Sequence, residues 1–288
     1  MELQTLIQHI QKVELRCKSL THQKLAGLFN SSFKGRGLAL DSIRKYENGD
    51  DIRGINWNVT ARFRETYVNT FTEDKERLIW ILLDVSGSGT FGTSQKNKLT
   101  LAIETGATLA FSALENNDRV GVIFFSDKVE KLLPPSRGMA GFWRIAKELV
   151  QVQAQGKGTD ITAALHFLMK ISHHRSVVFL LSDFMAAGYQ AVARVVAQQH
   201  ELVAVRVYDE KEKHLPAIGW AKLQDTENGS EQWVNTASLS FQKAYSNRFE
   251  EVEQYYHDTF GKGAAGMLKI STGDDFVQKL LQFMSGRI

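Results

Sequence analysis

The chain is poor in cysteine and proline: its 288 residues include one cysteine, Cys17, and three prolines. A single cysteine can form neither an internal disulfide nor a thiolate metal cluster, and it favours a reducing compartment, so we expect a cytoplasmic protein. The few prolines exclude a proline-rich linker and argue against the frequent turns of an all-β sandwich. Long hydrophobic runs are also missing. The longest, such as Leu78–Leu83, have the length of a strand, so we expect no membrane span.

No stretch interleaves aromatic and basic side chains in the manner of a nucleic-acid-binding module, and the net charge is only +3. We therefore expect no specific nucleic acid partner. What the chain does have is an ordinary globular composition, with 43% hydrophobic and 23% charged residues. A chain of this length and composition can bury a full hydrophobic core.

Hydrophobic patterning divides the sequence into three parts. Residues 1–20 carry apolar side chains at helical spacing, and we interpret residues 1–30 as an N-terminal helical segment. Residues 31–76 combine glycines, charges and short apolar pieces, which predicts a β-rich segment. From residue 77 to residue 288, strand and helix patterns alternate, which is typical of a mainly parallel sheet covered on both faces. The predicted fold is a three-layer, doubly wound α/β domain with a helical and β-rich N-terminal extension.

The apolar runs also predict where the elements of this domain lie. The strands are expected at residues 78–85, 120–125, 129–133, 177–181, 202–207 and 267–270. The helices are expected at residues 99–114, 141–152, 160–172, 188–199, 239–259 and 274–284. Asn228-Gly229 is a hairpin turn signal between two further short strands. The aromatic stripe from Phe241 to Phe260 is interpreted as core and not as a partner groove.

Polar side chains gather where two of these strands end and where one helix begins. They comprise two carboxylates and three hydroxyls, contributed by Asp84, Ser86, Ser88, Thr159 and Asp183. In open α/β sheets, ligands bind beyond the carboxyl ends of the strands. Oxygen ligands with few charges suit a hard cation such as Mg²⁺ or Mn²⁺. Taken singly, these residues are ordinary turn and helix-cap residues. Together and in this order, they predict a metal site.

Competing motifs in the same loop fit less well. The spacing of Gly87, Gly89 and Gly92 matches a dinucleotide fingerprint, but Asp84 would then face a pyrophosphate. A haloacid-dehalogenase-type phosphatase needs a second Asp at the position of Ser86. A nucleophile elbow around Ser88 would need glycine at that same position. We therefore identify neither a nucleophile nor a general base, and we expect no enzymatic activity.

The chain from about residue 77 resembles a von Willebrand factor type A domain. The resemblance implies that the five oxygen-bearing residues form a metal-ion-dependent adhesion site (MIDAS). It implies direct ligation by Ser86 and Ser88, direct or water-mediated contact by Thr159, and mostly water-mediated contact by Asp84 and Asp183. Lys157, two residues before Thr159, is an unexpected positive charge close to a predicted cation site.

The stretch from residue 44 to residue 62 resembles the signature of a bacterial family catalogued as domain of unknown function 58. The residues that carry this resemblance are Arg44, Tyr46, Gly49, Asp50, Asp51, Arg53, Trp57 and Arg62. The resemblance implies that residues 31–76 pack on and brace the type A domain, and that residues 215–236 are a β-hairpin insertion. It also implies a partnership with a MoxR-type AAA+ ATPase in protein maturation or chaperone-like assembly.

The charged residues of this signature have a structural interpretation. Arginines and carboxylates can form a charge network that fixes turns, because Arg binds carboxylates in a bidentate manner. In this interpretation Trp57 anchors the segment on the main domain. The role of the Gly49-Asp50-Asp51 stretch is left open by the sequence.

The function predicted from the sequence is metal-dependent protein binding. In this hypothesis Mg²⁺ bridges the site to an Asp or Glu of a partner protein, either the AAA+ ATPase or its client. Two alternatives stay open, namely a Mg²⁺-dependent phosphohydrolase and a type A scaffold without metal.

Overall fold

The computed structural model describes residues 38–63, 65–73, 76–90, 97–153, 158–213, 215–224, 231–261 and 265–286. The predicted N-terminal helical segment and the turn at Asn228-Gly229 lie outside the described residues. The chain divides into a small unit, Phe33–Arg77, and a main unit that contains Leu78–Ile288. The predicted boundaries of the β-rich segment differ from this small unit by two residues at one end and one at the other.

The small unit is built on two antiparallel strands, β1 (Leu38–Lys45) and β2 (Tyr67–Glu73). Between them lie the 3₁₀ helix η1 (Ile52–Gly54) and the short helix α3 (Trp57–Phe63). Asn56 joins these pieces, because its side chain accepts a hydrogen bond from Val59 N (3.1 Å) and donates one to the Asn69 side chain (2.8 Å). The β-rich prediction is thus correct for the strands but omits α3.

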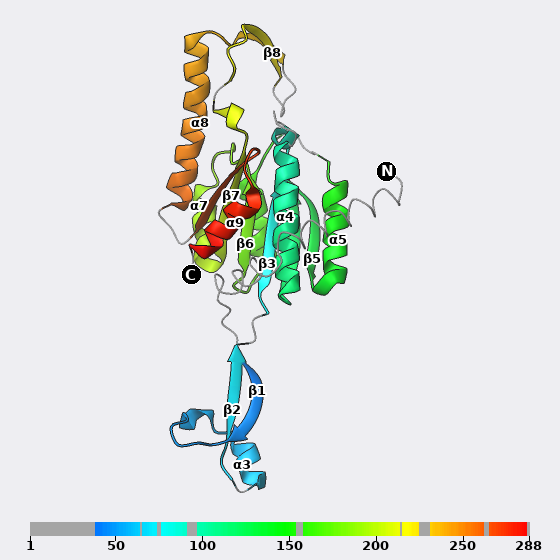
Figure 1. Ribbon diagram of the computed structural model, residues 1–288, viewed down its shortest axis with the longest axis vertical. Helices are drawn as coiled ribbons and strands as arrows, with labels where there is room; N and C mark the ends of the chain where they lie inside the picture. The colour runs from blue at the N-terminus through cyan, green and yellow to red at the C-terminus, as the bar shows by residue number, and fades with distance from the viewer. Residues whose placement is uncertain are drawn as a thin grey trace. The chain divides into compact units, whose positions relative to one another are not determined.

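The main unit contains a six-stranded sheet in the order β10-β7-β6-β3-β4-β5 (Figure 1). All neighbours are parallel except β4 and β5, which form the predicted hairpin. The strands span Leu78–Asp84 (β3), Arg119–Phe125 (β4), Val129–Ser136 (β5), Val177–Ser182 (β6), Glu201–Tyr208 (β7) and Gly266–Ser271 (β10). β3 and β6 are apolar along almost their whole length because helices cover both faces of the sheet.

Helices form the two outer layers, which confirms the predicted three-layer, doubly wound fold. One face carries α4 (Lys98–Glu115), α5 (Gly138–Gln151) and α9 (Phe276–Ser285), which lie in front of the sheet in Figure 1. On the other face, α6 (Ile161–Ile171), α7 (Gln190–Gln199) and the C-terminal part of α8 (Leu239–Phe260) pack in one core cluster with β3, β4, β6 and β7.

The C-terminal half of α8 belongs to the core, as the aromatic stripe predicts. Tyr256 and Phe260 are fully buried, and the Tyr256 hydroxyl donates to the Ala204 carbonyl of β7 at 2.8 Å. Phe241 and Tyr245, near the start of the helix, are only half-buried. The core interpretation therefore holds for the half of the stripe that reaches the sheet.

An antiparallel hairpin, β8 (Trp220–Gln224) and β9 (Glu231–Asn235), stands between β7 and α8. The 3₁₀ helix η3 (Glu210–Glu212) connects β7 to it, and the hairpin projects from the carboxyl edge of the sheet (Figure 1). This is the predicted insertion. Across the described residues, no helix is both long and apolar enough to cross a membrane.

Candidate metal centre

Asp84 is held at the carboxyl edge where β3 lies beside β6. The two strands are parallel, and their pairing ends with Leu83 opposite Leu181, so the residues that follow these two lie close together. The Asp84 carboxylate accepts hydrogen bonds from the Ser86 backbone N–H at 2.9 Å and from the Ser182 hydroxyl at 2.6 Å. Asp84 is only 8% exposed. Its carboxylate is therefore fixed in a buried position.

The hydroxyls of the first loop converge beside this carboxylate. A 3₁₀ turn, η2 (Gly87–Thr90), brings Ser86 Oγ and Ser88 Oγ to within 3.0 Å of each other. Neighbouring ligands of an octahedral Mg²⁺, with metal–oxygen distances of about 2.1 Å, are separated by about 3 Å. The Ser88 hydroxyl also lies close enough to Asp183 to lower the pKa of that carboxyl. The hydroxyl pair thus has the spacing of two adjacent metal ligands.

Thr159 is anchored one strand further along the same edge. Asp160 N donates to the Ser126 carbonyl at 2.7 Å, and Ser126 follows β4, whose last residue pairs with Asp84. The N-cap of α6 is Asp160, whose side chain accepts from Ala163 N at 2.9 Å. The cap role that Thr159 could have played is thereby taken. Its hydroxyl is buried and has no hydrogen-bond partner within the described part of the chain.

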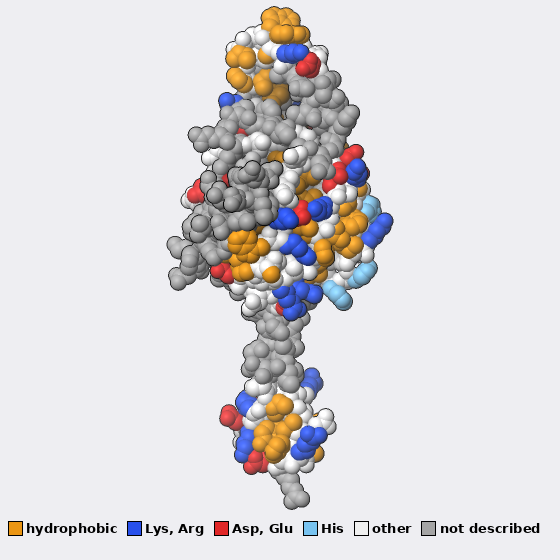
Figure 2. Space-filling model, turned by 90° about the vertical axis from the view of Figure 1, so that its right-hand side faces the viewer, with side chains coloured by type: hydrophobic (Ala, Val, Ile, Leu, Met, Phe, Trp, Pro, Cys, Tyr) orange, Lys and Arg blue, Asp and Glu red, His pale blue; other side chains and the backbone are white. Residues whose placement is uncertain are grey.

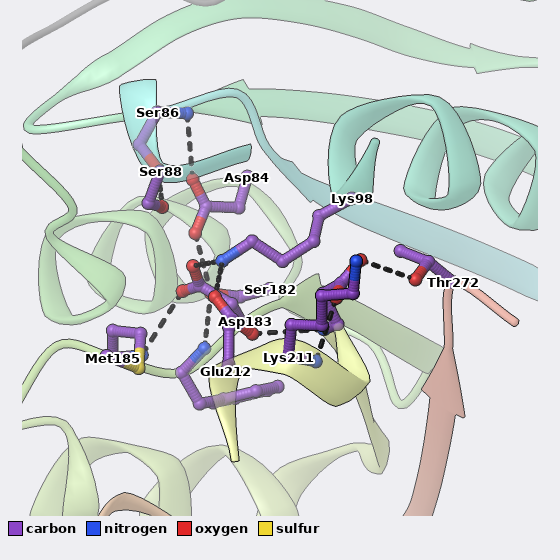
Figure 3. Close-up of polar contacts among 12 residues, drawn as sticks. Asp84, Ser86, Ser88, Lys98, Ser182, Asp183, Met185, Lys211, Glu212 and Thr272 are labelled. Carbon is purple, nitrogen blue, oxygen red and sulfur yellow. Dashed lines mark hydrogen bonds and ion pairs between the residues drawn. The ribbon is translucent and has the colours of Figure 1, made fainter. Parts of the chain in front are cut away.

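Four of the five predicted residues line one small cleft. Asp84, Ser86, Ser88 and Asp183 form it together with Ser182 and with a residue from α4, Lys98 (Figure 3). Thr159 is not among the described residues that line this cleft. The structure therefore brings four of these residues together and places the fifth at the same edge of the sheet. Lys157 lies outside the described residues.

Lys98 is the residue of this site that sequence reasoning missed. Its ammonium donates to Asp183 Oδ2 at 2.7 Å and to Glu212 Oε1 at 2.6 Å (Figure 3). The Lys98 side chain is only 4% exposed. These partners are 85 and 114 residues away along the chain. One signal was available: Lys98 begins α4, and a cation at a helix N-terminus opposes the helix dipole unless an anion holds it there.

The two carboxyls differ in pKa because their neighbours differ. Burial, together with the nearby charge of Asp183, raises the pKa of Asp84 to about 6. Burial also opposes ionisation of Asp183, but the Lys98 ammonium outweighs it and holds the pKa of Asp183 below the ordinary value. The same ion pairs raise the pKa of Lys98 despite its burial. Without a bound cation, Asp84 is the carboxyl of the pair whose ionised form is disfavoured.

This difference predicts a pH dependence in chelator-treated protein. The folded pKa of Asp84 exceeds the unfolded one, so its contribution to stability is complete below pH 3.8 and is lost as the pH rises to about 6. Relative to Asp84→Asn, the wild type should lose up to about 3 kcal/mol of unfolding free energy over that window. Chemical denaturation in EDTA from pH 4 to pH 7.5 measures it. A pH-independent difference would contradict the assignment.

The donor set fits a hard divalent cation. It offers two carboxylates and three hydroxyls, and Mg²⁺ favours oxygen ligands of this kind. One of these hydroxyls, that of Thr159, has no hydrogen-bond partner among the residues that the structure describes. No described residue of the cleft lining is a histidine that could serve as a base for a serine nucleophile. The arrangement is therefore suited to binding a cation and, through it, an anion.

The signature residues of the small unit serve its turns. Arg44 binds Asp50 in a bidentate manner, at 2.8 and 2.7 Å. Asp51 caps η1 by accepting from Arg53 N at 2.9 Å. Gly49 has φ +113°, a conformation that favours glycine. The predicted charge network is thus confirmed for Arg44 and Asp50, whereas Arg53 contributes its backbone N–H.

Three other signature residues take no part in this charge network in the part of the chain that the structure describes. Tyr46 N donates to the Thr66 carbonyl at 2.8 Å, which closes the end of the strand pair. Arg62 is exposed in the last turn of α3, and Trp57 is 70% exposed. The anchoring of Trp57, and the packing of this unit on the main domain, stay predictions.

Comparison with known proteins gives the following matches. The family model described as "Protein of unknown function DUF58" matches residues 42–255. An uncharacterised protein of Mycobacterium tuberculosis is 26% identical over 286 residues, which cover 95% of this chain and 88% of that protein.

Solved structures match this chain with lower sequence identity. BatB from Bacteroides thetaiotaomicron has a TM-score of 0.48 at 17% identity, covering 73% of this chain and 98% of that chain. Proximal thread matrix protein 1 from the mussel byssus, with a zinc-occupied MIDAS motif, has a TM-score of 0.41 at 15% identity, covering 74% and 47%.

Proposed function

Starting from the fact that the chain belongs to the DUF58 family of proteins of unknown function, we propose that it is a metal-dependent protein-binding module and not an enzyme. The observation that carries the proposal is the buried Thr159 hydroxyl, which has no partner among the described residues at an edge where two serine hydroxyls already lie 3.0 Å apart. A buried hydroxyl without a partner costs free energy, and a cation would satisfy it.

In this proposal the hydroxyls of Ser86, Ser88 and Thr159 hold Mg²⁺ or Mn²⁺, and Asp84 and Asp183 supply the negative charge. When bound, the cation provides a Lewis-acidic position for an Asp or Glu side chain of a partner protein. Ser182 orients Asp84 through its 2.6 Å hydrogen bond, and Lys98 holds Asp183. These contacts keep the carboxylates in place before a cation or a partner arrives.

The hairpin that projects from the same edge of the sheet supports a protein partner. Trp220 is 71% exposed and Trp233 is 63% exposed. The register of β8 and β9 places both tryptophans on one face, next to the Lys222–Glu231 ion pair. Figure 2 shows hydrophobic side chains gathered at this end of the main unit, with charged groups beside them. Exposed tryptophan framed by polar groups is typical of protein-binding surfaces.

We infer that the partner is a MoxR-type AAA+ ATPase or a client of one, and that the encounter takes place in the cytoplasm. The resemblance stated from the sequence supports the choice of ATPase. The geometry supports the chemistry of the contact, which is an acidic side chain that reaches the cation and an apolar surface that meets the tryptophans.

Direct metal binding and partner capture test this function. Wild-type protein should bind Mn²⁺, as measured by electron paramagnetic resonance, and should capture the MoxR-type ATPase of the same host in Mg²⁺ but not in EDTA. Ser86→Ala should lose both properties, while Ser112→Ala, a buried serine of α4, should lose neither. Capture that persists in EDTA, or phosphate release from a phosphate ester that depends on Asp84, would contradict the proposal.

A further inference from the structure

A buried ion pair extends the site beyond the five residues that the resemblance implies. We propose that Lys98 and Glu212 belong to the metal centre as positioning residues, and that Glu212 offsets the charge of Lys98 so that the cluster keeps the charge that a divalent cation neutralises. This inference rests on the proposed function, because it concerns the same cation site.

The geometry ties both residues to the site. The Lys98 ammonium lies 2.7 Å from Asp183 and 2.6 Å from Glu212. The Lys98 side chain is 4% exposed and that of Glu212 is 14% exposed. Glu212 has no freedom to leave, because its other oxygen accepts from Asp209 N at 3.0 Å. Asp209 in turn accepts from Lys211 N and from the Thr272 hydroxyl, at 2.9 and 2.7 Å (Figure 3). Lys98 is thus clamped between two fixed carboxylates.

The charges explain why Glu212 is needed. With Asp84 and Asp183 alone, one ammonium would leave the cluster with a net charge of −1, one unit short of neutralising a divalent cation. Glu212 is the third carboxylate, so three anions and one cation leave a net charge of −2. A dication would also repel an ammonium bound to the same Asp183 carboxylate. Glu212 offsets this repulsion by sharing the ammonium.

The inference makes opposite predictions for the two partners. Glu212→Gln leaves a charge of −1 and should weaken Mn²⁺ binding about tenfold, within the usual range of coupling between neighbouring groups. Lys98→Met leaves −3 and should tighten Mn²⁺ binding by a similar factor. The double variant returns to −2 and should bind Mn²⁺ within about threefold of the wild type. A residue that only stabilises the fold would not produce this reversal.

The experiment is a titration of each full-length variant with Mn²⁺ by isothermal calorimetry at one pH and ionic strength. Glu210→Gln is the matched control, because it removes the same charge from η3 at a residue that is exposed and paired with Lys213. Circular dichroism checks that each variant is folded. If Lys98→Met does not fold, Lys98→Gln, which keeps a donor, replaces it.

The outcomes separate this inference from the proposed function. If wild type binds Mn²⁺ but Glu212→Gln binds it as tightly as Glu210→Gln does, the inference is overturned and the proposed function stands. If the wild type does not bind Mn²⁺ and Lys98→Met does, the Lys98 ammonium competes with the cation, and both the inference and the proposed function are overturned. If no folded variant binds Mn²⁺, both are overturned.

Discussion

Saturating Mg²⁺ or Mn²⁺ is expected to raise the melting temperature of the wild-type protein and to leave that of Asp84→Asn unchanged. A ligand that binds only the folded state adds about 2.7 kcal/mol when it is present at a hundred times its dissociation constant. For a domain of this size, that corresponds to a rise of roughly 5–10 °C. Asp84 governs this effect because it is the buried carboxylate beside the Ser86 and Ser88 hydroxyls, and its oxygens accept from the Ser86 N–H and the Ser182 hydroxyl.

Asparagine is the right substitution because Asp84 is buried. Asp84 is 8% exposed and accepts two hydrogen bonds. Alanine would leave the Ser86 N–H and the Ser182 hydroxyl without this partner. Asparagine keeps an acceptor and removes the charge.

Differential scanning calorimetry, with and without metal, measures the shift. Asp160→Asn is the control, because it removes an aspartate next to Thr159 and asparagine caps a helix equally well. In EDTA near neutral pH the order should reverse, with Asp84→Asn more stable than the wild type, because burial disfavours the Asp84 charge. A metal-induced shift that survives in Asp84→Asn would place the cation elsewhere.

Replacing both Trp220 and Trp233 by alanine is expected to abolish capture of the ATPase partner while Mn²⁺ binding is kept. Exposed tryptophans that become buried in an interface often contribute 2 kcal/mol or more each, so the loss in affinity should exceed about a hundredfold. The fold should tolerate the change, because both side chains are mostly exposed and lie on a hairpin outside the main sheet.

Surface plasmon resonance with the purified ATPase in Mg²⁺ measures this loss. Val195→Ala provides the control: it removes an exposed apolar side chain, 40% exposed, from α7. If the double tryptophan variant binds the ATPase as the wild type does, the hairpin is not part of the interface. Metal-dependent contact at the strand edge would then have to account for the whole affinity.

Most of the candidate site could be predicted because its residues follow the ends of parallel strands, and the direction of the chain places these ends at one edge of the sheet. Apolar runs such as Leu78–Leu83 are long enough for one strand and too short for a membrane helix, so the alternation of strands and helices follows from their spacing. Parallel strands end at the same edge, which brings Asp84 near Asp183 without further information. The sequence in this way predicted both the edge and four oxygen-bearing residues that line the cleft there.

Other features depend on neighbours that are distant in sequence. The short helix α3 carries no strong apolar period, so a segment rich in glycine and charge was predicted only as strands and turns. The Thr159 hydroxyl was compatible with a helix cap until the structure gave that role to Asp160. In each case a local pattern allowed two outcomes, and packing selected one.

The order of the elements, the edge at which the candidate ligands lie and their oxygen-rich character could all be predicted from the sequence. These properties follow from periodicity and chain direction, which are local. The electrostatics of the site, by contrast, depend on the tertiary structure. Burial raises the pKa of Asp84, and Lys98 joins Asp183 to Glu212 across 85 and 114 residues of chain, because charge interactions depend on distance in space and on exclusion of water.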